Sequence, residues 1–146
     1  MIDRELVTRK LVLIAEDLPA TEELARQERE AYLASPISEV LAERYLERII
    51  GRMIDVNYHL LTESGQPPPR DYFQSFVELG RLGVLEPDTA RRIAACAGLR
   101  NRLVHEYDAL DPEKVHQALQ TAVIDLPEYL DGVRRFLERG VTALGT

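Results

Sequence analysis

The chain has 146 residues, which is enough for one domain with a single hydrophobic core. Apolar residues make up 45% and charged residues 29%, a composition that excludes an intrinsically disordered chain. The formal net charge of −7 excludes a protein that attracts nucleic acid through its overall charge, so any nucleic-acid site must consist of locally clustered arginines.

Two long helices are expected in the N-terminal half. Residues 3–34 carry a helical stripe of apolar side chains, and Pro19 predicts a kink or a short break within it. A second helix is expected from Pro36 to about Leu61 or Thr62, with Ser35 as its N-cap. Its predicted core face consists of Leu41, Tyr45, Ile49, Met53, Val56 and Leu60. The stretch ESGQPPPR then predicts a loop.

Three further helices are expected after this loop. A short one covers residues 71–83, with Tyr72, Phe73, Phe76 and Leu79 as its anchors. A fourth helix begins at LEPDTARR and runs into the stretch RNRLVHEY, with Cys96 packed in it as a small hydrophobe rather than a nucleophile. Asp111 and Pro112 begin the last helix, in which Pro127 predicts a kink.

No segment shows the alternation typical of a strand. The sequence therefore predicts a single all-α domain over residues 1–146, an antiparallel bundle of four main helices plus a short one. The N-terminus has no apolar core of a signal peptide, and no apolar run approaches the length of about 18 residues that a membrane span needs. We expect a cytoplasmic protein without membrane contact.

The stretch RNRLVHEY combines the residue types that phosphate chemistry needs: Arg100, Asn101, Arg102, His105 and Tyr107. Arginine is a permanent cation whose donors match phosphate oxygens, and histidine gives or takes a proton near neutral pH. Two arginines and two histidines around one phosphodiester would suffice for RNA cleavage without a metal or another cofactor. The stretch is also compatible with an ordinary helix end, where the dipole favours histidine and the arginines face solvent.

The spacing of Arg100 and His105 raises a geometric problem. Five residues on an ideal helix place their side chains about 140° apart, whereas Asn101 and His105 share a face. One straight helix therefore does not aim Arg100 and His105 at one small ligand. Either the helix ends near Val104, or a second copy of the chain completes the site.

Two other clusters allow competing interpretations. Arg44, Arg48, Arg52, Asp55 and His59 share one face of the second helix, either as an extension of a phosphate-binding cleft or as an exposed face of ion pairs with Glu43 and Glu47. Elsewhere, Glu113 and His116 have the spacing of a helical metal-ligand pair. A di-metal bundle would need a second such pair, which the sequence lacks, so no metal is expected.

The motif R-N-x-L-V-H-x-Y resembles the R-x4-H-x-Y signature of the HepT-like proteins, a family of the HEPN superfamily. The resemblance extends over about residues 2–139, including the segment SPISEVLAERYLERIIGRMIDVNYHL and its D-x-x-x-H pair at Asp55 and His59. These proteins are toxins of type VII-like modules in which a nucleotidyltransferase (MNT) is the antitoxin. Family members dimerise so that two motifs face each other across a cleft.

The resemblance implies a role for each residue of the motif. Arg100 and His105 match the residues that family members use for metal-independent endoribonuclease activity. Asn101, Arg102, Asp55 and His59 would support that site. Tyr107 matches the tyrosine that the antitoxin adenylylates to silence the toxin. The expected partners are a second copy, an MNT-type nucleotidyltransferase and RNA. The alternative is a helical module of the same fold that binds a nucleotide or a partner without cleaving RNA.

Overall fold

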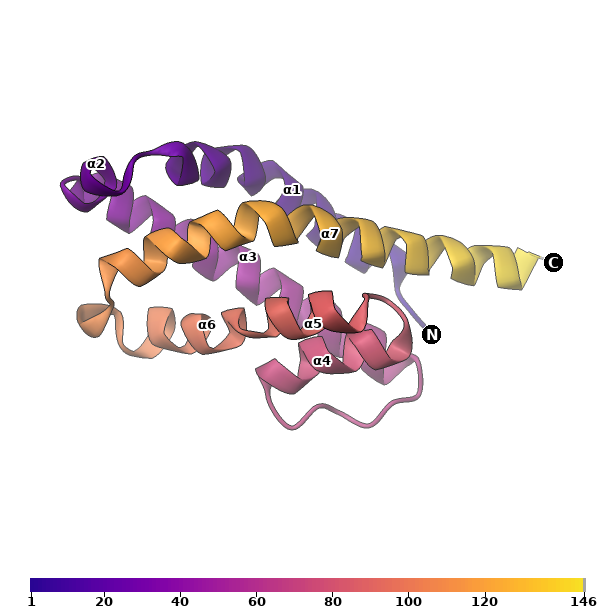
Figure 1. Cartoon of the computed structure of the whole chain (residues 1–146). Helices are drawn as coiled ribbons and strands as arrows, with labels where there is room; N and C mark the ends of the chain where they lie inside the picture. The colour runs from indigo at the N-terminus through magenta and orange to yellow at the C-terminus, as the bar shows by residue number, and fades with distance from the viewer. Residues whose placement is uncertain (146) are drawn as a thin grey trace.

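The computed structural model describes residues 1–145, and for Tyr107 and residues 141–145 it describes the backbone alone. The helices in chain order are α1 (Arg4–Arg26), α2 (Arg29–Leu33), α3 (Pro36–Glu63), α4 (Tyr72–Leu82), α5 (Pro87–Ala94), α6 (Cys96–His105), the 3-10 turn η1 (Tyr107–Ala109) and α7 (Pro112–Gly145) (Figure 1). The residues described contain no strand, which confirms the all-α prediction. No helix of residues 1–145 is both long and apolar enough to cross a bilayer.

Helix α3 is the centre of the bundle and packs against α1, α4, α6 and α7 (Figure 1). The core consists of fully buried side chains from most helices, among them Ile14, Ile49, Leu60, Phe76, Leu79, Leu119 and Tyr129. Burial of such side chains contributes roughly 1.5–3 kcal/mol each, so this core is the main source of stability. The bundle therefore fixes where the faces of α3 and α6 point.

Of the kink or short break predicted at Pro19, the break is wrong, because α1 continues through Pro19 and ends at Arg26. Pro19 removes a single backbone donor, and the buried Ile14 and Thr21 on either side keep the helix packed. Helix α1 instead ends beside α7, whose side chains contact the carbonyl groups that the end of α1 leaves free. Gln120 Nε2 donates to the Ala25 carbonyl, and His116 Nε2 lies 3.0 Å from the Gln27 carbonyl oxygen.

The predicted start and length of α3 are confirmed, and Ser35 caps it by accepting the Ser38 N–H at 3.2 Å. One predicted core position is wrong: Leu41 is 44% exposed. The apolar buried face of α3 begins instead at Ala42 and Leu46, and Leu41 lies on the outward face with Ile37 and Val40. That outward face continues into Arg44, Arg48 and Arg52, which together form an arginine ladder along α3.

The single helix predicted after residue 86 is interrupted at Ala95, which separates α5 from α6. Ala95 keeps right-handed helical dihedral angles, so the chain does not turn sharply there. In α4, Tyr72, Phe76 and Leu79 pack against or within the core as predicted, but Phe73 is 50% exposed. Helix α6 then continues as far as His105, where Glu106 N–H donates to the Arg102 carbonyl at 2.8 Å.

Helix α7 begins as predicted, with the Asp111 carboxylate accepting the Glu113 N–H at 3.0 Å. It remains one helix through Pro127. Gly132 allows α7 to pass the turn after α4, because a Cβ at this position would lie 2.7 Å from the Val84 carbonyl oxygen. This close passage fixes α7 against the part of the chain that leads into α5 and α6.

Candidate functional site

Arg100 is held in place by an aromatic ring rather than by a carboxylate. Its guanidinium carbon lies 5.1 Å from the centre of the Tyr72 ring, at the start of α4. Within the described part of the chain, no acidic side chain forms an ion pair with Arg100. The charge of Arg100 is therefore available to an anionic ligand.

A buried chain of hydrogen bonds positions the backbone of Tyr72. The Tyr129 hydroxyl donates to Asn57 Oδ1 at 2.6 Å, and Asn57 Nδ2 donates to Ser75 Oγ at 3.1 Å. Ser75 Oγ in turn donates to the Tyr72 carbonyl at 2.6 Å. Burial raises the pKa of Tyr129 well above its ordinary value, so the hydroxyl keeps its proton and remains a donor.

His105 is the last residue of α6 and is exposed, as is Asn101 one turn earlier on the same face. Because α6 stays helical through His105, Arg100 and His105 project from faces about 140° apart. The helix end thus does not bring the histidine round to the arginine within one chain. Arg102 lies on a further face of α6 and lines a different pocket, toward α7.

A pocket of about 300 Å³ lies beside Arg100, between α6, α4 and the outward face of α3. Four arginines and two carboxylates line it: Arg44, Arg48, Arg52, Arg100, Glu47 and Asp55. The lining therefore carries more cations than carboxylates, which suits an anion such as a phosphate.

The arginine ladder is organised by an acid that sequence reasoning missed. Asp17 of α1 is almost completely buried and pairs with Arg52 at 2.8 Å and with Arg48 at 3.3 Å. The predicted pair of Arg44 with Glu47 is present at 3.6 Å. Asp17 stands on the apolar stripe of α1, three residues after Ile14, and an acid at such a position is the signal that could have identified it.

Asp55 and His59 of α3 bind residues at the beginning of α1. Lys10 Nζ lies 3.0 Å from Asp55 Oδ2, and His59 Nε2 accepts the Asp3 N–H at 2.8 Å. Asp55 also lines the pocket beside Arg100, whereas His59 is not among the lining residues. Of the predicted supporting residues that the structure describes, only Asp55 thus lines the pocket beside Arg100.

Of the remaining sequence candidates, Glu113, His116 and Cys96 are not among the lining residues of this pocket. Tyr107 begins η1 directly after α6, and its side chain lies outside the described part of the structure. Glu113 forms an ion pair with Arg29, and the ring of His116 packs 4.8 Å from that of Tyr32. Burial raises the pKa of the Cys96 thiol, which suits a packed side chain.

Comparison with known proteins identifies the family to which the chain belongs. The family model described as "Ribonuclease HepT-like" matches residues 14–133. The chain is 34% identical over 136 residues to the tRNA nuclease HepT of Aphanizomenon flos-aquae (strain 2012/KM1/D3), a match that covers 93% of this chain and 92% of that protein.

Solved structures with low sequence identity share the fold. The cytosolic protein of unknown function YutE from Bacillus subtilis superposes with a TM-score of 0.84 at 17% identity, over 96% of this chain and 94% of that one. The tri-AMPylated Shewanella oneidensis HEPN toxin, in complex with its MNT antitoxin, superposes with a TM-score of 0.79 at 18% identity, over 92% and 99%. With the family model and the close relative in agreement, the chain belongs to the ribonuclease HepT-like family.

Proposed function

We propose that this chain is the toxin of a type VII-like toxin–antitoxin pair and acts as a metal-independent RNA endonuclease. One observation carries the proposal: helix α6 presents Arg100, free of any described carboxylate and facing a cationic pocket, together with an exposed His105. Both side chains are of the kind that binds and cleaves a phosphodiester. The similarity to a tRNA nuclease makes tRNA the first substrate to test.

The site would be completed by a second copy of the chain. The two side chains diverge by about 140° on α6, so one subunit does not direct both at one phosphate. A two-fold axis beside α6 would place two Asn101–His105 faces opposite each other, with an Arg100 at either edge. Exposure of Asn101 and His105 in the single chain supports this arrangement.

The proposed reaction is an attack of the ribose 2′-hydroxyl on the adjacent phosphorus. One His105 removes the 2′-hydroxyl proton, and the new O–P bond forms as the bond to the 5′-oxygen breaks. The second His105 gives a proton to that leaving oxygen, and the arginines stabilise the added negative charge. The products are a 2′,3′-cyclic phosphate and a free 5′-hydroxyl.

The proposed control is adenylylation of Tyr107 by an MNT-type nucleotidyltransferase. Tyr107 follows His105 by two residues, and η1 keeps its backbone at the end of α6. Addition of AMP would place an anionic phosphate beside the cations that hold RNA and would obstruct the cleft. The fold shared with a HEPN toxin solved together with its MNT antitoxin supports this choice of partner.

The decisive experiment is cleavage of tRNA and of an unstructured RNA by purified wild type, Arg100→Ala and His105→Ala. We expect wild type to cleave in the presence of EDTA and to leave 2′,3′-cyclic ends, and each variant to lose activity while its circular dichroism spectrum is unchanged. Arg91→Ala is the matched control, because Arg91 is an exposed arginine on α5 paired with Asp88.

Other results would contradict the proposal. Absence of cleavage by wild type would favour the non-catalytic binding module. Cleavage that EDTA abolishes, or that survives both substitutions, would refute the metal-independent mechanism.

A further inference from the structure

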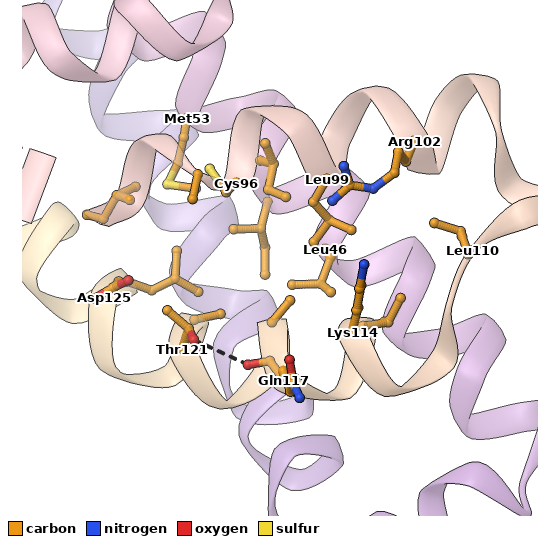
Figure 2. A pocket seen from close by; sticks show the side chains of 18 of the residues that line it. Leu46, Met53, Cys96, Leu99, Arg102, Leu110, Lys114, Gln117, Thr121 and Asp125 are labelled. Atoms are coloured by element: carbon orange, nitrogen blue, oxygen red, sulfur yellow. Dashed lines mark hydrogen bonds between the residues drawn. The ribbon is translucent and has the colours of Figure 1, made fainter. Parts of the chain in front are cut away.

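A second and larger pocket, of about 420 Å³, lies between α6 and α7 with α3 as its floor (Figure 2). Its floor and inner walls are apolar and include Leu46, Ile49, Ile50, Met53, Leu99 and Ala118. The pocket is separate from the one beside Arg100, since the two share no lining residue. Its volume and mostly apolar lining are those of a small-molecule site.

The two ends of this pocket differ in charge. At one end Arg102 of α6 and Lys114 of α7 point into the pocket from opposite walls (Figure 2). Neither forms an ion pair or a side-chain hydrogen bond with any other described residue, and the one acid that lines this end, Asp111, caps the Glu113 N–H. At the other end Arg92 is already bound to Asp125, at 2.8 Å.

Few other polar groups line the pocket between these ends. Thr121 Oγ1 donates to the Gln117 carbonyl at 3.2 Å, so its hydrogen goes to the backbone of its own helix (Figure 2). A ligand that fills the pocket must therefore have an apolar body without many polar edges. Its charge must be negative and must lie at the end that Arg102 and Lys114 share.

We propose that the pocket between α6 and α7 binds a small amphipathic anion, with an aliphatic or aromatic body on the α3 floor and one carboxylate or phosphate head between Arg102 and Lys114. The apolar body would gain from leaving water, and the head would form charge-assisted hydrogen bonds with two cations that have no side-chain partner among the described residues. An RNA segment fits less well, because its bases would leave their polar edges unpaired on this floor.

Cys96 supplies a built-in reporter of occupancy. It is the one cysteine of the chain and it lines this pocket. Burial raises the pKa of this thiol, so its alkylation by N-ethylmaleimide is slow and is followed by intact mass at alkaline pH. A ligand that fills the pocket would cover the thiol and slow the reaction further. Binding anywhere else on the surface would leave this rate unchanged.

The test uses the purified full chain and four probes: decanoate, decyl phosphate, decan-1-ol and acetate. The two long-chain anions are kept below their micelle concentrations, and decan-1-ol is kept below its solubility limit. We expect decanoate or decyl phosphate to bind by calorimetry and to slow the alkylation of Cys96, and the preferred one of the two identifies the head group. Acetate lacks the body and decan-1-ol lacks the charge, so each should bind at least about tenfold more weakly.

Three variants locate the binding. Lys114→Gln should weaken the preferred probe about tenfold, and since Lys114 is exposed the substitution leaves the fold intact. Ala118→Trp should fill the pocket and abolish binding. Arg134→Gln, which removes a cation elsewhere on α7, is the matched control and should bind like wild type.

Several outcomes would overturn the proposal. The first is that neither anion binds, and the second is that decan-1-ol binds as tightly as decanoate. The others are that Lys114→Gln binds the preferred probe as tightly as wild type, or that calorimetry detects binding while the alkylation rate of Cys96 stays unchanged. A second copy of the chain is another possible occupant, and the sedimentation of Ala118→Trp tests for it. If the substitution dissociates an oligomer that wild type forms, the pocket is an interface between copies of the chain and the proposal is wrong.

Discussion

The ring of Tyr72 lies against the guanidinium of Arg100, with 5.1 Å between the ring centre and the guanidinium carbon. The backbone carbonyl of the same tyrosine accepts the Ser75 hydroxyl, which belongs to the buried hydrogen-bond chain from Tyr129. Arg100 is thus connected through Tyr72 to the centre of the bundle. We infer that Tyr72 is a positioning residue for Arg100.

Replacing Tyr72 with leucine should lower RNA cleavage without abolishing it. Loss of the cation–π contact, worth about 0.5–1 kcal/mol at an exposed site, corresponds to a decrease of roughly two- to fivefold in kcat/KM. Tyr72→Phe keeps the ring and should restore the rate. Phe136→Leu removes a comparable contact with Arg139 on α7 and is the matched control. Equal rates for the leucine and phenylalanine variants would show that the ring does not position Arg100.

A mixture of wild type with an inactive variant tests whether two copies build one site. Equal amounts of wild type and His105→Ala, unfolded and refolded together, should retain about a quarter of the wild-type activity if each cleft needs both histidines. A site contained in one chain would retain about half. Refolding wild type with Arg91→Ala should retain full activity and controls for losses during the procedure.

The buried hydrogen-bond chain should contribute measurably to stability. Tyr129→Phe leaves Asn57 Oδ1 without its donor in the core, at a cost of about 1–3 kcal/mol in the free energy of unfolding. Tyr32→Phe is the matched control, because the Tyr32 hydroxyl is equally buried but has no hydrogen-bond partner in the described structure. Urea unfolding followed by circular dichroism measures both. The Tyr129 hydroxyl also lies 3.0 Å from the Met53 carbonyl oxygen, so an equal loss in the two variants would mean that its hydrogen bonds to Asn57 and Met53 add nothing.

The helices could be predicted from sequence because their caps and apolar periodicity depend on local spacing. Helix α3 begins at Ser35 and Pro36 as its cap signals predict, and Arg100 and His105 stand on one short helix. Pro19 misled the prediction, since one missing donor costs less than the core packing around it supplies. Local propensity thus yields to tertiary packing at that position.

Contacts between distant segments could not be predicted. Tyr72 reaches Arg100 across 28 positions of the chain, and Asp17 reaches Arg52 across 35, through packing of helices that no periodicity specifies. Arg102 differs, because its direction depends on helical rotation within α6 alone. Its place between Arg100 and His105 in the motif suggested a shared site, but this rotation turns it toward α7.

Tyr107 should be the acceptor of AMP. Incubation of the chain with a cognate MNT-type nucleotidyltransferase, ATP and Mg²⁺ should add one or more AMP-sized increments to the intact mass, all located at Tyr107 by peptide mapping, and should stop RNA cleavage. Tyr107→Phe should gain no mass and stay active in the presence of the enzyme. Modification of the phenylalanine variant to the same extent would exclude Tyr107 from this role.

The arginine ladder on α3 should bind the RNA backbone next to the cleaved phosphate. Arg44 lines the pocket with Arg100, and its side chain is 65% exposed. Each phosphate contact on a single strand releases counterions. Arg44→Gln should therefore reduce the slope of log affinity against log salt concentration by about 0.7, and should raise KM while leaving kcat unchanged.

Arg91→Gln is the closely matched control, since Arg91 is 66% exposed and forms the same i, i+3 type of ion pair on α5. Binding of a non-cleavable 2′-deoxy substrate, measured by fluorescence anisotropy across a salt series, distinguishes the two. If both variants change the slope equally, the effect is general electrostatics rather than a contact at the pocket, and the RNA path does not follow α3.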